Sequence, residues 1–173
     1  MRGGDGSGKT TLLRLLAGDL RADAGTLSIH GITLSAQPDA YRRQVFWIDP
    51  RSTQFDQLSA LDCFKSLSHQ YPSLQAALTG ELAEGLGLTP HLAKPLYMLS
   101  TGSKRKVWLA AAFASGAAVV LLDDPFAALD KGSIRFVLEL LADAGEHPTR
   151  AWVMAHFEAP QGVALAQVIE LDE

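Results

Sequence analysis

The sequence contains a single cysteine, Cys63, so no disulfide can form within the chain. The first residues lack the basic segment and apolar run that make up a secretory signal. The longest apolar stretch, 108–122, has 15 residues and is interrupted by Ser115 and Gly116, so it is shorter than the roughly 20 residues needed to span a bilayer. We therefore expect a reducing, cytoplasmic setting and no membrane-spanning helix.

Charge points to no class of partner. The chain has 15 basic and 19 acidic residues and a formal net charge of −4, and neither sign forms a long block. Without a basic arm or patch, we expect no nucleic-acid partner and no direct binding to a lipid surface. There is also no internal repeat, low-complexity tract or proline-rich linker. At 173 residues and 47% hydrophobic content, the chain predicts one domain with a core of ordinary size.

The order of the predicted elements is typical of an α/β protein. Two short antiparallel strands are predicted within 27–34 and another strand at 45–48, whereas 56–96 contains helical stretches and no strand-like run. From residue 99 onward, helices and strands alternate. The expected ranges are helix 100–113, strand 117–122, helix 131–143, strand 151–155 and a last strand 167–171. Strands separated by helices predict a mostly parallel sheet flanked by helices.

A glycine-rich stretch near the start predicts a phosphate-binding loop. Gly3, Gly8, Lys9 and Thr10 occupy the fixed positions of the G-x-x-x-x-G-K-[ST] pattern, and the apolar run that follows predicts a helix ending at Gly18. In such a loop, backbone N–H groups surround a phosphate at a helix N-terminus, the lysine reaches the β- and γ-phosphates, and the hydroxyl binds Mg²⁺. The residues expected to contact the nucleotide are Gly3, Gly4, Asp5, Gly6, Ser7, Gly8, Lys9, Thr10 and Thr11.

A pair of carboxylates follows a predicted buried strand. Residues 119–125 read Val-Val-Leu-Leu-Asp-Asp-Pro, so the strand ends in Asp123 and Asp124. Open α/β sheets bind ligands at the carboxyl ends of their strands, where a carboxylate can hold magnesium. We expect Thr10 and Asp123 to be the metal-binding residues. A structural strand that ends in a solvated Asp-Pro turn would give the same pattern, and nucleoside kinases and GTPases share the phosphate loop.

A third group of residues resembles one particular family of NTPases. Residues 99–103, Leu-Ser-Thr-Gly-Ser, resemble the Leu-Ser-Gly-Gly-Gln signature of ATP-binding cassette (ABC) proteins. Asp123 follows Ser100 by 23 residues, which leaves room for one helix and one strand. Residues 127–130, Ala-Ala-Leu-Asp, are similar to the D-loop of that family, and His156 has the position of its switch histidine. The joint order and spacing resemble the ATP-binding subunit of an ABC transporter over nearly the whole chain.

The resemblance implies an α/β P-loop NTPase fold of the ABC type, with a RecA-like core at 1–50 and 99–173 and a helical subdomain at about 51–98. It implies that MgATP binds between two subunits paired head to tail, so that the signature of one covers the nucleotide of the other. Hydrolysis would then drive transport through an integral-membrane subunit, whose short helix would lie in a groove of the helical subdomain. This partner would hold the protein at the inner face of the cell membrane.

The resemblance also implies roles for individual residues. Asp124 would be the catalytic base and His156 the sensor of the γ-phosphate, and both are expected to be catalytic. The residues implied to contact the partner's nucleotide are Ser100, Thr101, Gly102 and Asp130.

Several positions depart from the family pattern. Asp124 stands where the family has glutamate, which withdraws the carboxylate by about one C–C bond, ~1.5 Å, and a shift of this size can cost roughly 10²-fold in rate. Pro50 takes the place of the glutamine that contacts Mg²⁺, and Asp49 and Gln54 are the nearby substitutes. The signature itself differs at its third and fifth residues.

The phosphate loop begins after two residues, whereas in the family it follows a strand inside the sheet, beside strand 117–122, and earlier strands carry an aromatic residue for adenine. We expect either a start codon placed too late or a degenerate subunit, and we expect the 173 residues alone to lack a stable fold.

Three other functions share part of the pattern. A degenerate ABC subunit that binds ATP in a regulatory role, with little turnover, is the main alternative. ABC ATPases of DNA repair or chromosome organisation carry long coiled-coil inserts, and Leu99 follows Arg51 by only 48 residues. A nucleoside or shikimate-type kinase has the phosphate loop but no use for residues 99–103.

Overall fold

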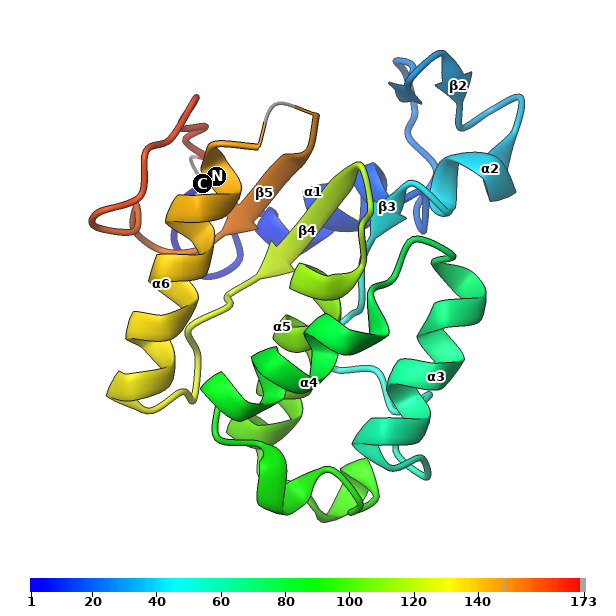
Figure 1. The fold of residues 1–173 in the computed structure, drawn as a ribbon. Helices are drawn as coiled ribbons and strands as arrows, with labels where there is room; N and C mark the ends of the chain where they lie inside the picture. Colours follow the sequence, from blue (N-terminus) through cyan, green and yellow to red (C-terminus); the bar gives the residue numbers. More distant parts are fainter. Residues whose placement is uncertain (148, 172–173) are drawn as a thin grey trace. The chain divides into compact units, whose positions relative to one another are not determined.

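The computed structural model describes residues 1–147 and 149–171, which form two compact units (Figure 1). The first unit comprises Met1–Trp47, Ala117–Pro125 and Ala142–Glu173, and the second comprises Ile48–Gly116 and Phe126–Leu141. The second unit therefore takes in more of the chain than the 51–98 expected for a helical subdomain.

A parallel three-stranded sheet forms the centre of the first unit. Its strands β3 (Val45–Phe46), β4 (Val119–Asp123) and β5 (Ala151–Ala155) are adjacent in that order. In this register Asp123 pairs with Ala155. The middle of β4 is buried and entirely apolar, as expected for a strand covered on both faces. The predicted parallel sheet is confirmed.

Helix α1 (Lys9–Ala17) packs against this sheet. The core cluster of the unit consists of Leu13, Ala17, Tyr41, Val45, Leu121 and Ala155. Leu13 is fully buried, which contributes on the order of 1.5–3 kcal/mol. Gly18, with φ 78°, ends the helix and donates its N–H to the carbonyls of Arg14 and Leu15. This is the glycine termination that the sequence predicts.

A small hairpin and a short helix complete this part of the first unit. The strands β1 (Ser28–Ile29) and β2 (Ile32–Thr33) pair antiparallel, as predicted. His30 and Gly31 connect them with φ of 48° and 80°, the positive values that a tight two-residue hairpin turn requires. Helix α2 (Pro38–Arg42) follows, and the Tyr41 hydroxyl donates a 2.9 Å hydrogen bond to the Leu16 carbonyl of α1.

The first residues of the chain lie beside residues 169–171, next to β5 (Figure 1). Arg2 forms isolated parallel bridges with His156 and with Glu170, and its N–H donates to the Ile169 carbonyl at 2.9 Å. Two expectations are wrong here. Residues 167–171 form no regular strand, because among the described residues Arg2 alone pairs with them. The segment before the phosphate loop also lies beside β5 instead of β4, since β3 and β5 already occupy both edges of β4.

The second unit is helical, with no named strand among its described residues. Its elements are α3 (Ala60–Gln70), α4 (Ala76–Gly85), the 3₁₀ turns η1 (Thr89–His91) and η2 (Leu96–Met98), α5 (Thr101–Ala114) and the larger part of α6 (Lys131–Gly145). Ser59 caps α3 by accepting a hydrogen bond from the Asp62 N–H. None of the helices in the described part of the chain combines the length and the apolar character needed to cross a membrane.

Close packing between elements holds the second unit together. The rings of Phe55 and Trp108 lie 5.6 Å apart in a tilted arrangement. Helices α4 and α6 meet at Gly85, where an added Cβ atom would lie 2.3 Å from Cζ of Phe136. Glycine at position 85 therefore sets how near the two helices come.

Candidate functional site

The predicted phosphate loop forms a turn that leads directly into α1. Gly6 and Gly8 have φ of 84° and 89°, values that residues with a side chain seldom adopt. No side chain caps α1, so the first N–H groups of the helix remain for another acceptor. Such a helix start favours an anion.

Close contacts fix the beginning of the loop. An added Cβ at Gly3 would lie 2.4 Å from the Leu171 carbonyl oxygen and 2.6 Å from Ser7 Oγ, so position 3 has no room for a side chain. Ser7 Oγ is buried and has no hydrogen-bond partner among the described residues. A buried hydroxyl without a partner is costly, and a phosphate oxygen would satisfy it.

Lys9 bends back over the loop. Its Nζ donates hydrogen bonds to the carbonyls of Gly3, at 2.7 Å, and Gly4, at 2.5 Å. The ammonium group therefore lies over the turn, where a phosphate would meet both its charge and the loop amides.

Thr10 and Asp123, the two predicted metal-binding residues, are in contact. The Thr10 hydroxyl donates a 2.7 Å hydrogen bond to Asp123 Oδ2, which joins the first turn of α1 to the end of β4. Hydroxyl and carboxylate oxygens are the hard ligands that Mg²⁺ prefers, and it usually takes one or two from protein and the rest from phosphate and water. The described residues contain no group of three or more His, Cys, Asp or Glu suited to a metal. The pair fits magnesium shared with a nucleotide.

Asp124 and His156, the predicted base and sensor, also form a pair. His156 Nδ1 lies 2.7 Å from Asp124 Oδ1, within hydrogen-bonding distance. His156 is nearly buried, with 9% of its side chain exposed, whereas half of the Asp124 side chain is exposed. The Asp124 backbone has φ 46°, and its N–H donates to the Ala155 carbonyl at 2.9 Å.

The residues of the predicted signature lie at the start of α5 in the second unit. Ser100 is the N-cap, and its Oγ accepts a 3.1 Å hydrogen bond from the Ser103 N–H. Thr101 is exposed and Gly102 is buried. A Cβ at Gly102 would lie 2.3 Å from the carbonyl oxygen of Ala128, so the helix start packs directly on the 126–130 turn.

Asp130 ends that turn and caps α6. Its carboxylate accepts hydrogen bonds from the Ser133 N–H and hydroxyl and forms a 2.7 Å ion pair with Lys106. Lys106, followed by the two Ser133 hydrogen bonds, holds the pKa of the Asp130 carboxyl well below its usual range. Sequence reasoning identified neither Lys106 nor Ser133. The Asp-x-x-Ser spacing at a helix start would have indicated Ser133, whereas nothing in the sequence links Asp130 to a lysine 24 residues away.

Comparison with models of protein families identifies the family of the chain that carries these residues. A family model described as ABC transporter matches residues 1–127. The chain belongs to the ABC transporter family. The predicted ABC nucleotide-binding domain, with its P-loop NTPase fold, is thereby confirmed.

Individual ABC proteins share much of the chain. It is 35% identical over 147 residues to the cytochrome c biogenesis ATP-binding export protein CcmA of Pseudomonas syringae pv. syringae (strain B728a), covering 84% of this chain and 68% of that one. The protein of the same name from Salmonella typhi is 36% identical over 132 residues, covering 76% and 62%. A solved ATP-binding subunit of an ABC transporter superposes with TM-score 0.77 at 25% identity, covering 88% and 65%. The chain spans about two thirds of the length of these ABC relatives.

The residues around the expected ABC glutamine position form a turn in the second unit. Asp49 Oδ1 accepts a 2.9 Å hydrogen bond from the Arg51 N–H, and the Gln54 N–H donates to Ser52 Oγ at 3.2 Å. A part for Asp49 or Gln54 at the metal, in place of Pro50, stays a prediction.

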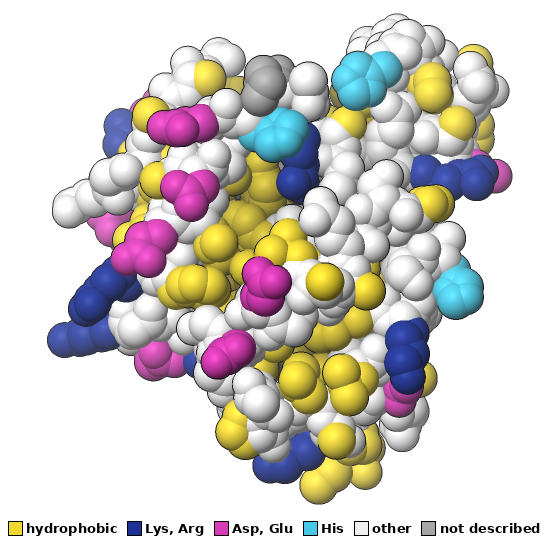
Figure 2. Space-filling view, in the orientation of Figure 1, with side chains coloured by type: hydrophobic (Ala, Val, Ile, Leu, Met, Phe, Trp, Pro, Cys, Tyr) yellow, Lys and Arg dark blue, Asp and Glu magenta, His cyan; other side chains and the backbone are white. Residues whose placement is uncertain are grey.

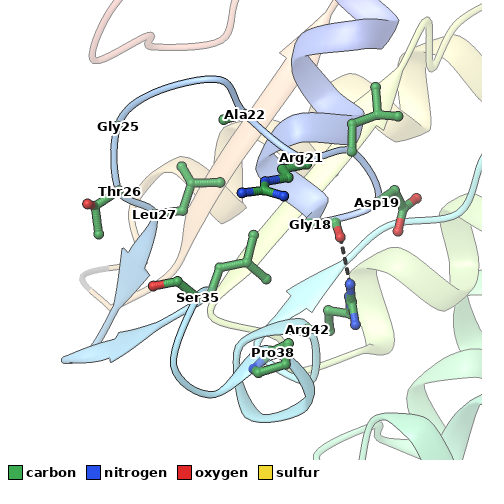
Figure 3. Close-up of a pocket in the computed structure, with 12 residues that line it drawn as sticks. Gly18, Asp19, Arg21, Ala22, Gly25, Thr26, Leu27, Ser35, Pro38 and Arg42 are labelled. Atoms are coloured by element: carbon green, nitrogen blue, oxygen red, sulfur yellow. Dashed lines mark hydrogen bonds between the residues drawn. The ribbon is translucent and has the colours of Figure 1, made fainter.

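A pocket of about 570 Å³ lies at the far end of α1 from the predicted phosphate loop (Figure 3). Arg42 Nη2 donates a 2.8 Å hydrogen bond to the Gly18 carbonyl at its wall, and Arg21 extends across it. The pocket also includes Leu27 and Leu34 beside the hairpin. Because it adjoins the C-terminus of α1, it is separate from the residues predicted to bind nucleotide.

Proposed function

We propose that this ABC domain binds MgATP on the loop at 3–8 and hydrolyses it, and that hydrolysis drives transport through an integral-membrane partner. The observation that carries the proposal is the meeting of the loop, the Thr10–Asp123 contact and the Asp124–His156 pair within one unit, at the carboxyl ends of β4 and β5. Ligands of open α/β sheets bind at this edge.

Each residue at this edge has a distinct task. Lys9 places a positive charge at the phosphates, and the Ser7 hydroxyl and loop amides supply further donors. Thr10 and Asp123 would hold Mg²⁺, which neutralises charge on the phosphates when it is bound. The shared location of ammonium, hydroxyl and carboxylate is what a triphosphate with a divalent cation requires.

Asp124 would accept the proton of the attacking water, with His156 holding its carboxylate in place. The 2.7 Å contact restricts the carboxylate to one orientation, and the histidine ring is itself confined because it is nearly buried. The side chain is one methylene shorter than the family's glutamate, which predicts slow turnover.

A second copy would complete the site. The N-terminus of α5, with Ser100, Thr101 and Gly102, and the turn ending at Asp130 would cover the nucleotide on the partner's phosphate loop. Support comes from the start of α5, where the helix dipole and the N–H groups other than that of Ser103 favour a phosphate. The family division into a RecA-like core and a helical subdomain at about 51–98 belongs to the same proposal.

The membrane partner would contact the second unit. Hydrophobic side chains reach the surface in this part of the molecule (Figure 2), and the large exposed ones include Leu61, Tyr97 and Met98. Exposed apolar residues of this size are suited to a protein partner. The CcmA relatives are named as ATP-binding export proteins, which supports a transport role. The proposal places the protein at the inner face of the cell membrane through its partner.

The proposal is tested by replacing the loop lysine. Lys9→Ala should weaken MgATP binding by roughly 100-fold or more, because the charge-assisted contacts to the β- and γ-phosphates are lost. Isothermal titration calorimetry measures the affinity. The matched control is Lys65→Ala, a lysine with 77% of its side chain exposed, which should bind as the unmodified protein does. An unchanged affinity for Lys9→Ala would rule out the phosphate-loop assignment.

A hydrolysis assay distinguishes the proposed ATPase from the regulatory alternative, a subunit that binds ATP with little turnover. The short side chain of Asp124 favours that alternative. Single-turnover measurements with excess protein report the chemical step without product release. Conversion of bound ATP to ADP that depends on Asp124 would support the ATPase, whereas stable binding without conversion would support a regulatory subunit.

A further inference from the structure

The signature helix and the 126–130 turn are joined by two contacts on one face of α5. Gly102 and Lys106 are four residues apart, so they lie on the same side of the helix. Gly102 admits the Ala128 carbonyl oxygen so closely that a Cβ atom would lie 2.3 Å from it. One helical turn further, Lys106 Nζ lies 2.7 Å from Asp130 Oδ2.

Lys106 is held more firmly than the other paired lysine of α5. Its side chain is 15% exposed, against 28% for Lys104, which pairs with Asp56 at 2.6 Å. Asp130 is 62% exposed and its other contacts are to Ser133, at the start of α6. Lys106 is therefore the fixed member of the pair, and it ties the turn to α5.

The turn itself needs such support. Ala128 has φ 59°, a left-handed conformation that is unfavourable for a residue with a Cβ atom and persists only where the surroundings fix it. The Leu129 N–H donates to the Phe126 carbonyl at 3.2 Å, and Asp130 caps α6 beyond it. Gly102 and Lys106 contact the 126–130 turn at two points, so they hold the backbone at Ala128 in a single conformation.

We propose that Lys106 is a positioning residue for ATP hydrolysis, which locks the 126–130 turn to the first turn of α5 so that both meet the nucleotide of a second copy as one rigid element. This inference rests on the proposed function. Since the Asp130 carboxylate is 62% exposed, we expect the ion pair to act through geometry more than through stability. Without the Lys106–Asp130 ion pair, the 126–130 turn and the first turn of α5 would have to be ordered separately each time the two copies close on ATP.

The first test removes the charge but keeps the side-chain stem. Lys106→Met should lower kcat by roughly 10- to 100-fold while leaving the melting temperature and the KM for MgATP nearly unchanged, since nucleotide is bound mainly by the loop of the other copy. Lys106→Arg, which can still reach Asp130, should recover most of the rate. The matched control is Lys104→Met, which removes the neighbouring ion pair of the same helix and should leave kcat close to that of the unmodified protein.

A double-mutant cycle identifies the partner. If Lys106 acts through Asp130, the loss of rate in Lys106→Met with Asp130→Asn together should be no larger than in the more severe single variant. Independent, multiplying losses would overturn the proposal, and so would full activity in Lys106→Met. If Lys106→Met does not fold, Asp130→Asn and Lys106→Arg provide the same test. A folded Asp130→Asn variant with unchanged kcat would also overturn the proposal.

Mixed pairs decide whether the effect acts across the interface. Consider a dimer in which one copy carries Lys9→Ala. Its one remaining active site is formed by the phosphate loop of the other copy and the signature residues of the Lys9→Ala copy. Lys106→Met should abolish most activity when it is placed in the Lys9→Ala copy and have little effect in the other. Equal loss in both placements would overturn the inference. Absence of hydrolysis in the unmodified protein would instead overturn the proposed function, and this inference with it.

Discussion

Thr10 Oγ1 and Asp123 Oδ2 lie 2.7 Å apart, although 113 residues separate them in the sequence. The contact joins the helix that follows the phosphate loop to the strand that ends in the carboxylate pair. Both oxygens can bind a divalent cation, so the same contact that stabilises the fold also marks the candidate metal position.

Removal of the Thr10 hydroxyl tests this position. Thr10→Val keeps the shape of the side chain but removes the oxygen, so we expect the gain in ATP affinity on adding Mg²⁺ to disappear. Thr10→Ser keeps the hydroxyl and should retain that gain. The measurement is ATP binding with Mg²⁺ and with EDTA. An identical Mg²⁺ response in Thr10→Val would remove Thr10 from the metal site.

The turnover rate should depend on both the length and the charge of the side chain at position 124. Asp124→Asn should lower turnover by roughly 10²-fold or more because it removes the base. Asp124→Glu should raise turnover by moving the carboxylate forward, at a cost in folding stability of about 1 kcal/mol, because φ is 46° here and Asp tolerates the left-handed region better than Glu. ATP hydrolysis and thermal unfolding measure the two effects. Equal hydrolysis rates in all three proteins would exclude Asp124 from the reaction.

Two glycines of α4 should respond to alanine with opposite signs. Gly85→Ala places a Cβ atom 2.3 Å from the Phe136 ring, and we expect it to destabilise the protein by about 1–3 kcal/mol. Gly80 lies in the same helix with nothing within 4 Å of the added atom, so Gly80→Ala should stabilise by about 0.5–1 kcal/mol.

Urea denaturation measures both changes in unfolding free energy. Phe136→Leu combined with Gly85→Ala should recover part of the loss because the smaller side chain frees space. Equal effects of Gly85→Ala and Gly80→Ala would contradict the close approach of α4 and α6.

Cys63 should be chemically inert in the folded protein. It is fully buried, and burial raises the pKa of its thiol to about 12, so almost no thiolate is present near pH 8. We expect iodoacetamide to label Cys63 slowly in native protein and rapidly in denaturant, as followed by mass spectrometry. Rapid labelling of native protein at pH 8 would show that α3 opens readily.

The residues that sequence reasoning located best are those whose chemistry demands a particular backbone. Gly8, Lys9 and Thr10 could be recognised because a loop around a phosphate needs glycines and one cation at fixed spacing. Asp123 and Asp124 could be placed at the edge of the sheet because the buried apolar part of a strand must end before two charges. In each case the local sequence contains the physical requirement.

Contacts between distant segments were not predictable in the same way. Nothing in the sequence indicates that Lys106 pairs with Asp130, because only the packing of α5 against the 126–130 turn brings them together. Residues 167–171 include the β-branched pair Val168 and Ile169, which favours a strand, yet a strand also needs a neighbour with paired backbone groups along its length. Arg2 supplies one such residue, which explains the isolated bridge at Glu170.

The pairing of Asp123 with Ala155 in the β4–β5 ladder makes the next residues of both strands, Asp124 and His156, neighbours. Side chains alternate between the faces of a sheet, so a slip of one residue would turn one member of this pair away from the other. The histidine contact therefore depends on the register of β4 and β5. Amide hydrogen exchange along β5 should then set an upper limit on the fraction of molecules that are competent for chemistry at any moment.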